Sequence, residues 1–180
     1  MRLFVAVDLP IGLKDYLFAF ASHLKTPAAQ VSLARELHVT LKFLGDVDEN
    51  KVDSIERRLT NVFFRPFQAK LSKVGTFDEP VKVVWGSVEP HEPFCKLAKE
   101  VDRALSEYKN DYPVYIPHIT FCRVKKVIAS EAFRELVDAM KLDQRMFEVS
   151  SFHLYQSIEG QEGHRYKIIR TYAAHVTKAL

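Results

Sequence analysis

Cysteine is scarce in this chain, which has two, Cys95 and Cys122, among 180 residues. Two cysteines without metal-ligand spacing exclude a disulfide-stabilised scaffold and a cysteine-based zinc site, so we expect two buried free thiols. Linkers rich in glycine, proline or serine are also missing. Their absence predicts one compact domain over residues 1–180.

Long apolar runs and a strong net charge are missing as well. The apolar stretches are too short to span a membrane, and Asp8 lies at the end of the first one, so neither a membrane span nor a secretory signal is expected. The formal net charge of +3 permits a phosphate ligand but does not require nucleic acid. We therefore expect a cytoplasmic, monomeric protein with no membrane partner.

One four-residue pattern occurs twice, eighty residues apart. His38-Val39-Thr40-Leu41 and His118-Ile119-Thr120-Phe121 both have a histidine, an apolar residue, a threonine and a second apolar residue. Side chains alternate between the two faces of a strand, so the histidine and the threonine of each segment share one face. The apolar residues would face a core. Each strand would then present an imidazole and a hydroxyl on the opposite side.

A third copy of the shorter pattern, His175-Val176-Thr177, lies in the last six residues of the chain. Lys178 follows it in place of an apolar residue, and chain ends often fray. We interpret this copy as a coincidence or a terminal strand, without a catalytic part.

The segments around the two motifs repeat in the same order. In the first half, an apolar strand at 3–7, a helix at 13–24, the first motif, a helix at 52–62 and a strand from 67 follow one another. In the second half, the order is a strand at 83–88, a helix at 94–108, the second motif, a helix at 133–140 and strands from 147. The repeat predicts an α+β fold with two similar lobes, near 1–80 and 81–180. We expect two antiparallel sheets, flanking helices and an approximate twofold axis that brings both motifs to a central cleft.

The paired motifs suit acid–base catalysis near neutral pH, because imidazole titrates close to that pH. One neutral ring can take a proton from an attacking water or hydroxyl, while the other, charged, gives a proton to the leaving oxygen. The hydroxyls of Thr40 and Thr120 can donate hydrogen bonds to phosphate oxygens. A cyclic phosphoester suits this set of groups, and no metal or other cofactor is expected.

Two cations adjoin the motifs. Under strict alternation Lys42 shares the face of His38, whereas Arg123 lies on the face of Ile119. Arg123 can therefore bind a phosphate only if its strand bulges or ends there. We expect the histidines outside the two motifs to be surface or structural residues. Three aromatic residues are expected in the core rather than as platforms for a nucleobase: Trp85, Phe121 and Tyr155.

The chain resembles the two-histidine (2H) phosphoesterase superfamily, and within it the RNA 2′,3′-cyclic phosphodiesterase branch, once described as 2′-5′ RNA ligases. The resemblance runs from end to end, and the flanks of the paired motifs are its specific part. Phe121-Cys122 departs from the smaller or aliphatic residues more usual in the family, which affects packing rather than the acid–base pair. The matching segments are residues 2–6, 37–45, 84–86, 117–123 and 154–157.

This resemblance implies a bilobal α+β fold and metal-independent hydrolysis of a terminal RNA 2′,3′-cyclic phosphate to a 2′-phosphate. It implies that His38 is the proton donor to the leaving 3′-oxygen and that His118 is the proton acceptor that activates water. Thr40, Thr120 and Arg123 would bind the phosphate. The near-symmetry of the motifs does not itself distinguish the acid from the base.

Two alternatives stay open at this level. Activity as a 2′-5′ RNA ligase is the reverse chemistry at the same site, since one histidine pair serves both directions. A non-catalytic RNA-binding module is the other alternative. Such modules usually have stacking aromatic side chains on a strongly basic face, whereas this chain is only weakly charged. The expected partners are RNA ends or cyclic-phosphate oligonucleotides, with tRNA fragments among the candidates.

Overall fold

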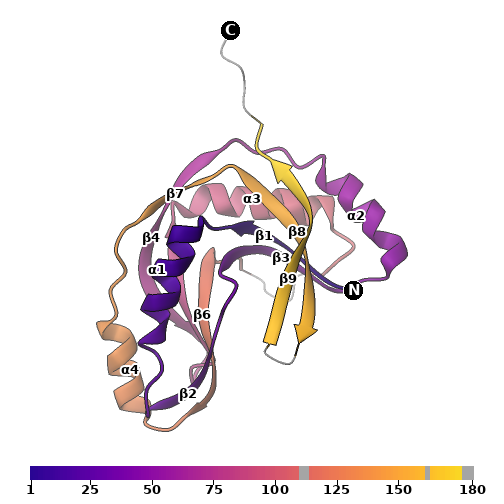
Figure 1. Cartoon of the computed structure of the whole chain (residues 1–180). Helices are drawn as coiled ribbons and strands as arrows, with labels where there is room; N and C mark the ends of the chain where they lie inside the picture. Colours follow the sequence, from indigo (N-terminus) through magenta and orange to yellow (C-terminus); the bar gives the residue numbers. More distant parts are fainter. Residues whose placement is uncertain (110–113, 161–162, 176–180) are drawn as a thin grey trace.

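Antiparallel strands form the body of the protein (Figure 1). The computed structural model describes residues 1–109, 114–160 and 163–175. In this part the strands join one curled sheet in the order β7-β4-β5-β6-β3-β1-β8-β9, with β2 paired to β6. The strands are β1 (Arg2–Asp8), β2 (Ala29–Leu33), β3 (His38–Asp46), β4 (Phe67–Phe77), β5 (Val83–Glu89), β6 (His118–Val127), β7 (Met146–Val149), β8 (Ser151–Gly160) and β9 (Gly163–Ala173).

Helices pack on both halves of this sheet. They are α1 (Ile11–Ser22), α2 (Val52–Leu59) after the short 3-10 helix η1 (Glu49–Lys51), α3 (His91–Ala104) and α4 (Ser130–Ala139). Helix α1 contacts β2 and β6, α3 contacts β3, and α4 contacts β4. No helix in the described ranges is long and apolar enough to cross a membrane.

The two halves of the sheet meet at the motif strands. β3 and β6 are antiparallel and pair at Val39 and Ile119. From this junction β3-β1-β8-β9 extend to one side and β6-β5-β4-β7 to the other. The predicted α+β fold with an approximate twofold arrangement of antiparallel strands and flanking helices is therefore confirmed, but the two expected sheets are two half-sheets of one sheet. The half-sheets are hydrogen-bonded to each other and make one continuous sheet.

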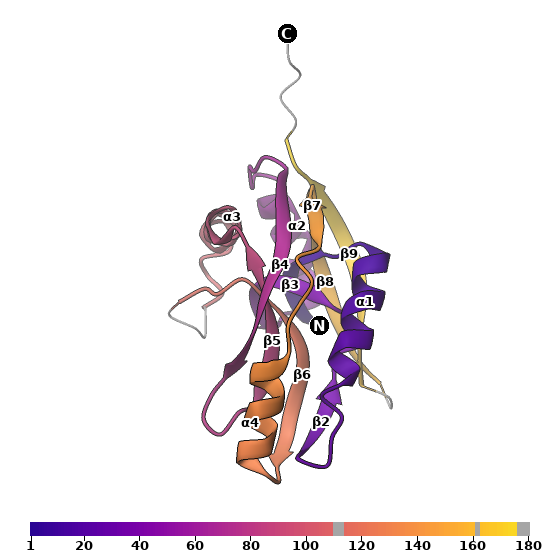
Figure 2. The same ribbon diagram turned by 90° about the vertical axis from the view of Figure 1, so that its left-hand side faces the viewer.

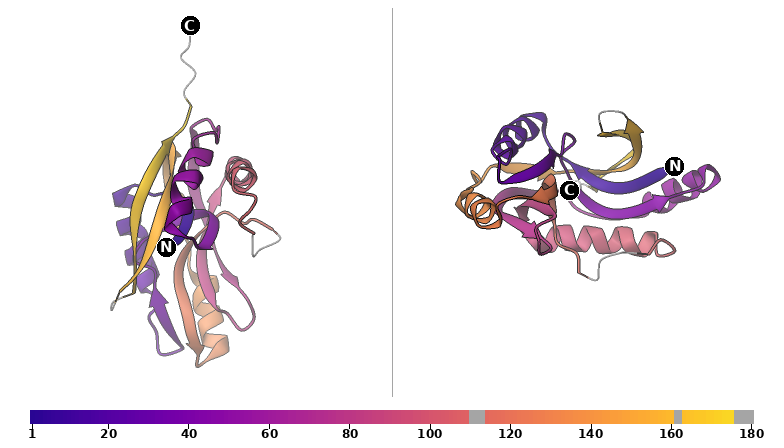
Figure 3. Two further views of the ribbon diagram at one scale, coloured as in Figure 1. Left: turned by 90° about the vertical axis from the view of Figure 1, so that its right-hand side faces the viewer. Right: turned by 90° about the horizontal axis from the view of Figure 1, so that it is seen from below.

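The halves of the sequence exchange strands in space. β4 comes from the first half of the chain and pairs with β5 of the second half, side by side in Figure 2. β8 comes from the end of the chain and pairs with β1 at its start, while β8 and β9 form a long hairpin along one edge (Figure 3). Each half of the sheet therefore draws its strands from both halves of the sequence.

The two faces of the sheet carry different residues, as the alternation predicts. Leu3, Val5 and Val7 of β1 point into the main core, together with Val39 and Ile119. The residues between them on β1 belong to a separate small cluster on the other face, made of Phe4, Ala6 and Tyr155, with Tyr166 packed against it. Since Val39 and Ile119 are fully buried in the main core, the motif histidines and threonines lie on the face of the small cluster.

Both cysteines are free thiols. Cys122 is buried in β6, as predicted, whereas Cys95 on α3 is only partly covered.

Candidate active site

The junction of β3 and β6 brings the two motifs together. With Val39 opposite Ile119, the antiparallel register puts His38 across from Thr120, and Thr40 across from His118. All four side chains are partly exposed. We call the side of the sheet that carries these four residues the motif face.

Both histidine rings are held in the same way. The Nδ1 atom of His38 lies 2.8 Å from the backbone oxygen of Glu36, and that of His118 lies 2.7 Å from the backbone oxygen of Ile116. A carbonyl oxygen can only accept, so Nδ1 carries the hydrogen and donates in both rings. The neutral ring then has its lone pair on Nε2, the atom that takes up or releases a proton.

Each motif strand contains a β-bulge directly after the motif threonine. The register of β3 with β1 shifts between Thr40 and Lys42. The register of β6 with β5 shifts between Thr120 and Cys122. One extra residue in each strand reverses the alternation of side chains beyond it. The residues after the bulge therefore change faces.

Lys42 does not lie on the motif face, so the prediction that it shares the face of His38 is wrong. Its side chain is buried, and its Nζ lies 2.6 Å from Oδ1 of Asp102 on α3. The bulge turns it toward the helix. Phe43 comes onto the motif face instead, with its ring 6.1 Å from that of Phe4.

The equivalent bulge in β6 turns Arg123 to the motif face. The sequence analysis predicted that Arg123 could bind a phosphate only if its strand bulged or ended there. Its side chain is exposed. Burial raises the pKa of the Tyr166 hydroxyl, and the nearby Arg123 guanidinium partly offsets this rise. Tyr166 itself packs edge-on against His38, with ring centroids 5.3 Å apart. Arg123 therefore lies on the motif face and near Tyr166, which contacts the first motif histidine.

Aromatic rings enclose His38. Phe4 lies 5.0 Å away between ring centroids, and Tyr155 stacks on Phe4 at 5.1 Å. Removal from water lowers the pKa of His38 to about 4, against weaker opposing effects of the Glu36 carbonyl and the Asp8 carboxylate. Tyr155 is buried as predicted, yet its burial is on the motif face.

His118 has an aromatic wall of its own. Phe77 packs edge-on at 4.9 Å, and Trp85 lies 5.9 Å away. Burial lowers the pKa of His118 as well. Trp85 is buried, as predicted, but its position opposite Thr120 puts it on the motif face. The sequence could not distinguish Trp85 on the motif face from a residue of the main core, because both kinds of position hold apolar side chains.

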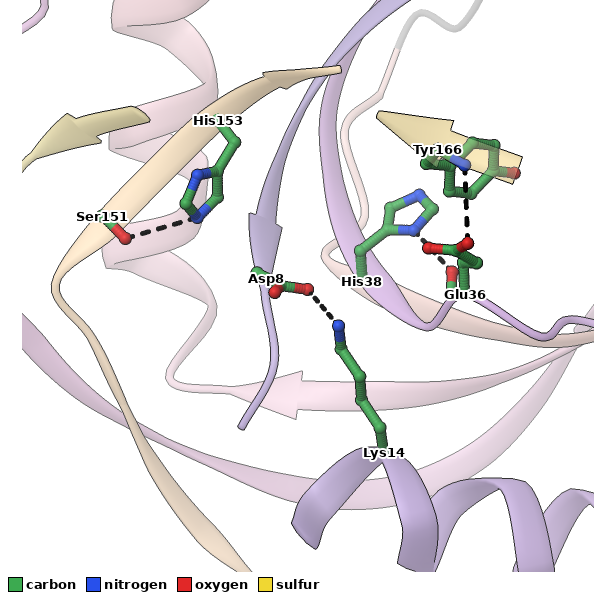
Figure 4. A network of polar contacts seen from close by, with 7 residues as sticks. All are labelled: Asp8, Lys14, Glu36, His38, Ser151, His153 and Tyr166. Atoms are coloured by element: carbon green, nitrogen blue, oxygen red, sulfur yellow. Dashed lines mark hydrogen bonds and ion pairs between the residues drawn. The ribbon is translucent and has the colours of Figure 1, made fainter. Parts of the chain in front are cut away.

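A charged pair adjoins His38 that the sequence analysis did not single out for the site. Asp8, the last residue of β1, stands opposite His38, and its Oδ1 lies 2.6 Å from Nζ of Lys14 on α1 (Figure 4). On the other side of His38, the Glu36 carboxylate accepts the backbone N–H of Tyr166 at 3.5 Å. The one sequence signal for Asp8 was a carboxylate at the end of an apolar strand.

His153 is a third histidine near this network, on β8. Its Nδ1 lies 2.9 Å from the Thr171 hydroxyl, and its Nε2 lies 3.4 Å from the Ser151 hydroxyl. Both ring nitrogens are thus hydrogen-bonded, which agrees with the structural role expected for His153. Within the described residues, no three histidine, cysteine or acidic side chains are grouped so that they could hold a metal ion.

The comparison with protein families identifies the superfamily of this chain. A model of the 2'-5' RNA ligase superfamily matches residues 15–161. The chain therefore belongs to this superfamily, whose members are two-histidine phosphoesterases.

Curated relatives make the resemblance more specific. The RNA 2',3'-cyclic phosphodiesterase of Methanocaldococcus jannaschii is 30% identical over 175 residues, which cover 94% of this chain and 99% of the relative. The protein of the same name from Archaeoglobus fulgidus is 33% identical over an alignment of 187 positions, which covers 96% of this chain and 99% of the relative.

Solved structures share the fold. The structure of E. coli LigT in its apo form aligns with a TM-score of 0.75 at 24% sequence identity, and covers 96% of each chain. The same protein complexed with 3'-AMP aligns with a TM-score of 0.73 at 23% identity, covering 96% of this chain and 97% of LigT. At these identities the likeness establishes the architecture.

Proposed function

We propose that the protein hydrolyses the terminal 2′,3′-cyclic phosphate of an RNA to a 2′-phosphate, with His38 and His118 as its acid–base pair. One observation carries the proposal: two rings of the same tautomer, each with Nε2 available for proton exchange, share one face with two threonine hydroxyls. The relatives named RNA 2',3'-cyclic phosphodiesterase support the substrate class.

In the proposed reaction, His118 takes a proton from a water molecule as the water oxygen forms a bond to phosphorus. The bond from phosphorus to the 3′-oxygen breaks, and His38 gives its Nε2 proton to that oxygen. The products are a 2′-phosphate and a 3′-hydroxyl, and solvent exchange restores the protons of both rings. The hydroxyls of Thr40 and Thr120 donate to the phosphate oxygens, and Arg123 offsets their charge.

The donor role of His38 requires a protonated ring, although burial keeps this ring neutral at neutral pH in the protein alone. A bound phosphodiester brings a negative charge next to the ring. A negative charge at contact distance favours imidazolium and raises the pKa again. Substrate binding therefore favours protonation of His38, which supplies the proton that the leaving oxygen takes up.

The decisive test uses an oligonucleotide that ends in a 2′,3′-cyclic phosphate, incubated with the full chain and EDTA. Comparison of the product with synthetic standards identifies the position of the phosphate. We expect a 2′-phosphate, formed at the same rate with and without the chelator. A 3′-phosphate, or a loss of activity that a divalent ion restores, would contradict the proposed mechanism.

Ligation is the second candidate, because the same pair of histidines can run the reaction in reverse and the family model is named for it. Millimolar 5′-hydroxyl oligonucleotide added to the cyclic-phosphate substrate would favour a 2′-5′ linkage. Tight binding of the substrate without any turnover would instead support the RNA-binding module. The natural RNA, such as a tRNA fragment, the monomeric state and the cytoplasmic location stay predictions.

A further inference from the structure

The two motif histidines are held alike, but the residues opposite them on the neighbouring strands differ. Asp8 of β1 stands across from His38, and Ser87 of β5 stands across from His118. Ser87 is buried and its hydroxyl lies 3.2 Å from Nε2 of His91. At this pair of related positions, the site therefore has a carboxylate on one side and a neutral hydroxyl on the other.

Asp8 is close enough to His38 to act on its charge. Residues directly opposite each other on antiparallel strands have Cβ atoms about 5 Å apart. Asp8 alternates with Phe4 and Ala6, so it shares their face of β1, the motif face. Figure 4 shows Asp8 between the rings of His38 and His153, with Lys14 reaching it from α1.

The charges of Asp8 and Lys14 have opposite effects on His38. The carboxylate favours the imidazolium form and the ammonium group opposes it, and His118 also opposes it. For His118, burial and its backbone hydrogen bond are the causes that the described residues supply. An anion that favours the protonated ring thus acts on His38 alone of the two.

Burial keeps the two tyrosines and the third histidine packed around His38 largely uncharged at neutral pH. Burial raises the pKa of the Tyr155 and Tyr166 hydroxyls and lowers that of His153. Glu36 contributes its backbone carbonyl to Nδ1 of the ring, and its carboxylate accepts a backbone N–H. Arg123 lies beyond Tyr166 on β6. Of the permanently charged side chains nearby, Asp8 and Lys14 are the two whose charges act on this ring.

We propose that Asp8 and Lys14 are the positioning pair that sets the proton affinity of His38 separately from that of His118, so that His38 can hold the proton once the phosphate is bound. Asp8 stabilises the imidazolium when the phosphate is bound. Lys14 limits this effect, so that the ring still releases its proton readily to the leaving oxygen. The proposal rests on the proposed function and names what breaks the symmetry of two otherwise matching motifs.

Two single substitutions test it, because they break the same ion pair and remove charges of opposite sign. NMR of the imidazole signals in the full chain, with inorganic phosphate present, follows both histidines. The pKa of His38 should fall by roughly one unit in Asp8→Asn and rise by a similar amount in Lys14→Met. In the double variant it should lie between these values. His118 should shift less in each case.

Matched controls separate this local effect from a change in net charge. Asp15→Asn and Lys25→Met alter the net charge by the same amounts at exposed positions on α1 and just after it. They should leave the pKa of both motif histidines unchanged. Shifts of the same sign in Asp8→Asn and Lys14→Met would indicate a structural role of the ion pair and overturn the proposal. So would a shift of His118 as large as that of His38.

The pH profile of kcat/KM gives a second readout. The same limb should move in both variants, to lower pH in Asp8→Asn and to higher pH in Lys14→Met, and it should be the limb that His38→Ala abolishes. The NMR titration needs no turnover, so the two ideas can fail separately. Opposite shifts of His38 without hydrolysis would refute the proposed function alone. Hydrolysis with an unshifted His38 would refute the role of Asp8 and Lys14 alone.

Discussion

The histidines of this site are kept neutral by the groups that surround them. Burial lowers the pKa of His38 from 6.5 to about 4, and it also lowers that of His118 and His153. Unfolding returns these rings to water. Between those two pH values these rings therefore bind more protons in the unfolded chain than in the folded one, so their contribution to the free energy of unfolding decreases as the pH falls.

His38→Asn should flatten this dependence. The contribution of His38 is fully present above pH 6.5 and is lost as the pH falls toward about 4. At roughly 1.4 kcal/mol per pKa unit, the wild type should lose up to about 3 kcal/mol more than the variant between neutral pH and pH 4. Urea denaturation at a series of pH values measures the difference. Equal slopes for the two proteins would show that the ring is not desolvated.

His38→Ala and His118→Ala should each lower kcat by roughly 10²–10⁴-fold, the usual contribution of one general acid or base. If His38 is the donor, an aryl ester whose leaving group needs no proton should restore activity to His38→Ala and not to His118→Ala. Steady-state kinetics on both substrates measures this. Restoration of His118→Ala instead would reverse the two assignments.

His175→Ala is the matched control for these variants, because it changes the third copy of the motif. The His175 ring stacks on Phe63 with centroids 4.5 Å apart, while Val176 and Thr177 lie outside the described residues. Turnover should stay close to wild type. A loss comparable to that of His38→Ala in a folded protein would show that the wrong motifs were paired.

At the scale of elements, two β-bulges decide which neighbours of the motifs reach the site. The sequence predicted both strands and the shared face of each histidine and threonine, because that alternation is local. It could not predict the bulges, since these depend on the register with β1 and β5. The sequence analysis therefore placed Lys42 on the wrong face, and it could assign Arg123 to phosphate binding only on the condition that the strand bulges.

The ion pair of Lys42 should matter for stability and little for catalysis. Asp102→Asn removes a charged partner from a buried ammonium group, and should reduce the free energy of unfolding by about 1–3 kcal/mol. Lys42→Met removes the buried charge itself, so it should reduce the free energy of unfolding by less than Asp102→Asn does. Urea denaturation gives both values. A large fall in kcat for folded Lys42→Met would restore Lys42 to the site.

Gly86 of β5 should tolerate no side chain. A Cβ atom there would overlap the ring of Phe121, the extra residue of the β6 bulge. Gly86→Ala should therefore destabilise the protein by about 1–3 kcal/mol. Gly12→Ala on α1 is the control, with nothing within 4 Å of the added carbon, and it should stabilise by up to about 1 kcal/mol. Thermal unfolding that ranks the two variants in the opposite order would contradict this packing.

At the scale of the whole molecule, the exchange of strands makes the two halves of the chain depend on each other. The sequence predicted the repeated order of strands and helices. It could not predict the exchange of strands between the two halves, because the order of elements does not fix which distant strands pair. Nor could the ion pair of Asp8 with Lys14 be predicted, since it depends on how α1 packs beside β1.

A fragment of residues 1–80 should therefore fail to fold alone. It contains β1 without β8 and β4 without β5, so each would expose an unpaired edge. Circular dichroism and the dispersion of its NMR spectrum should report a largely unfolded chain. A stable, well-dispersed fragment would mean that the first half is an autonomous unit.

The junction of the two half-sheets has a mechanical consequence. In the described residues, the ladder between β3 and β6 has a single rung, at Val39 and Ile119. The hydroxyl of Tyr115, just before the second motif, adds one tie by donating to the carbonyl oxygen of Thr40 at 3.0 Å. A change in the angle between the half-sheets at this rung would change the spacing of the two imidazoles. The distance between the two motif histidines therefore depends on a short junction, and under the proposed function a substrate held by both threonines would set it.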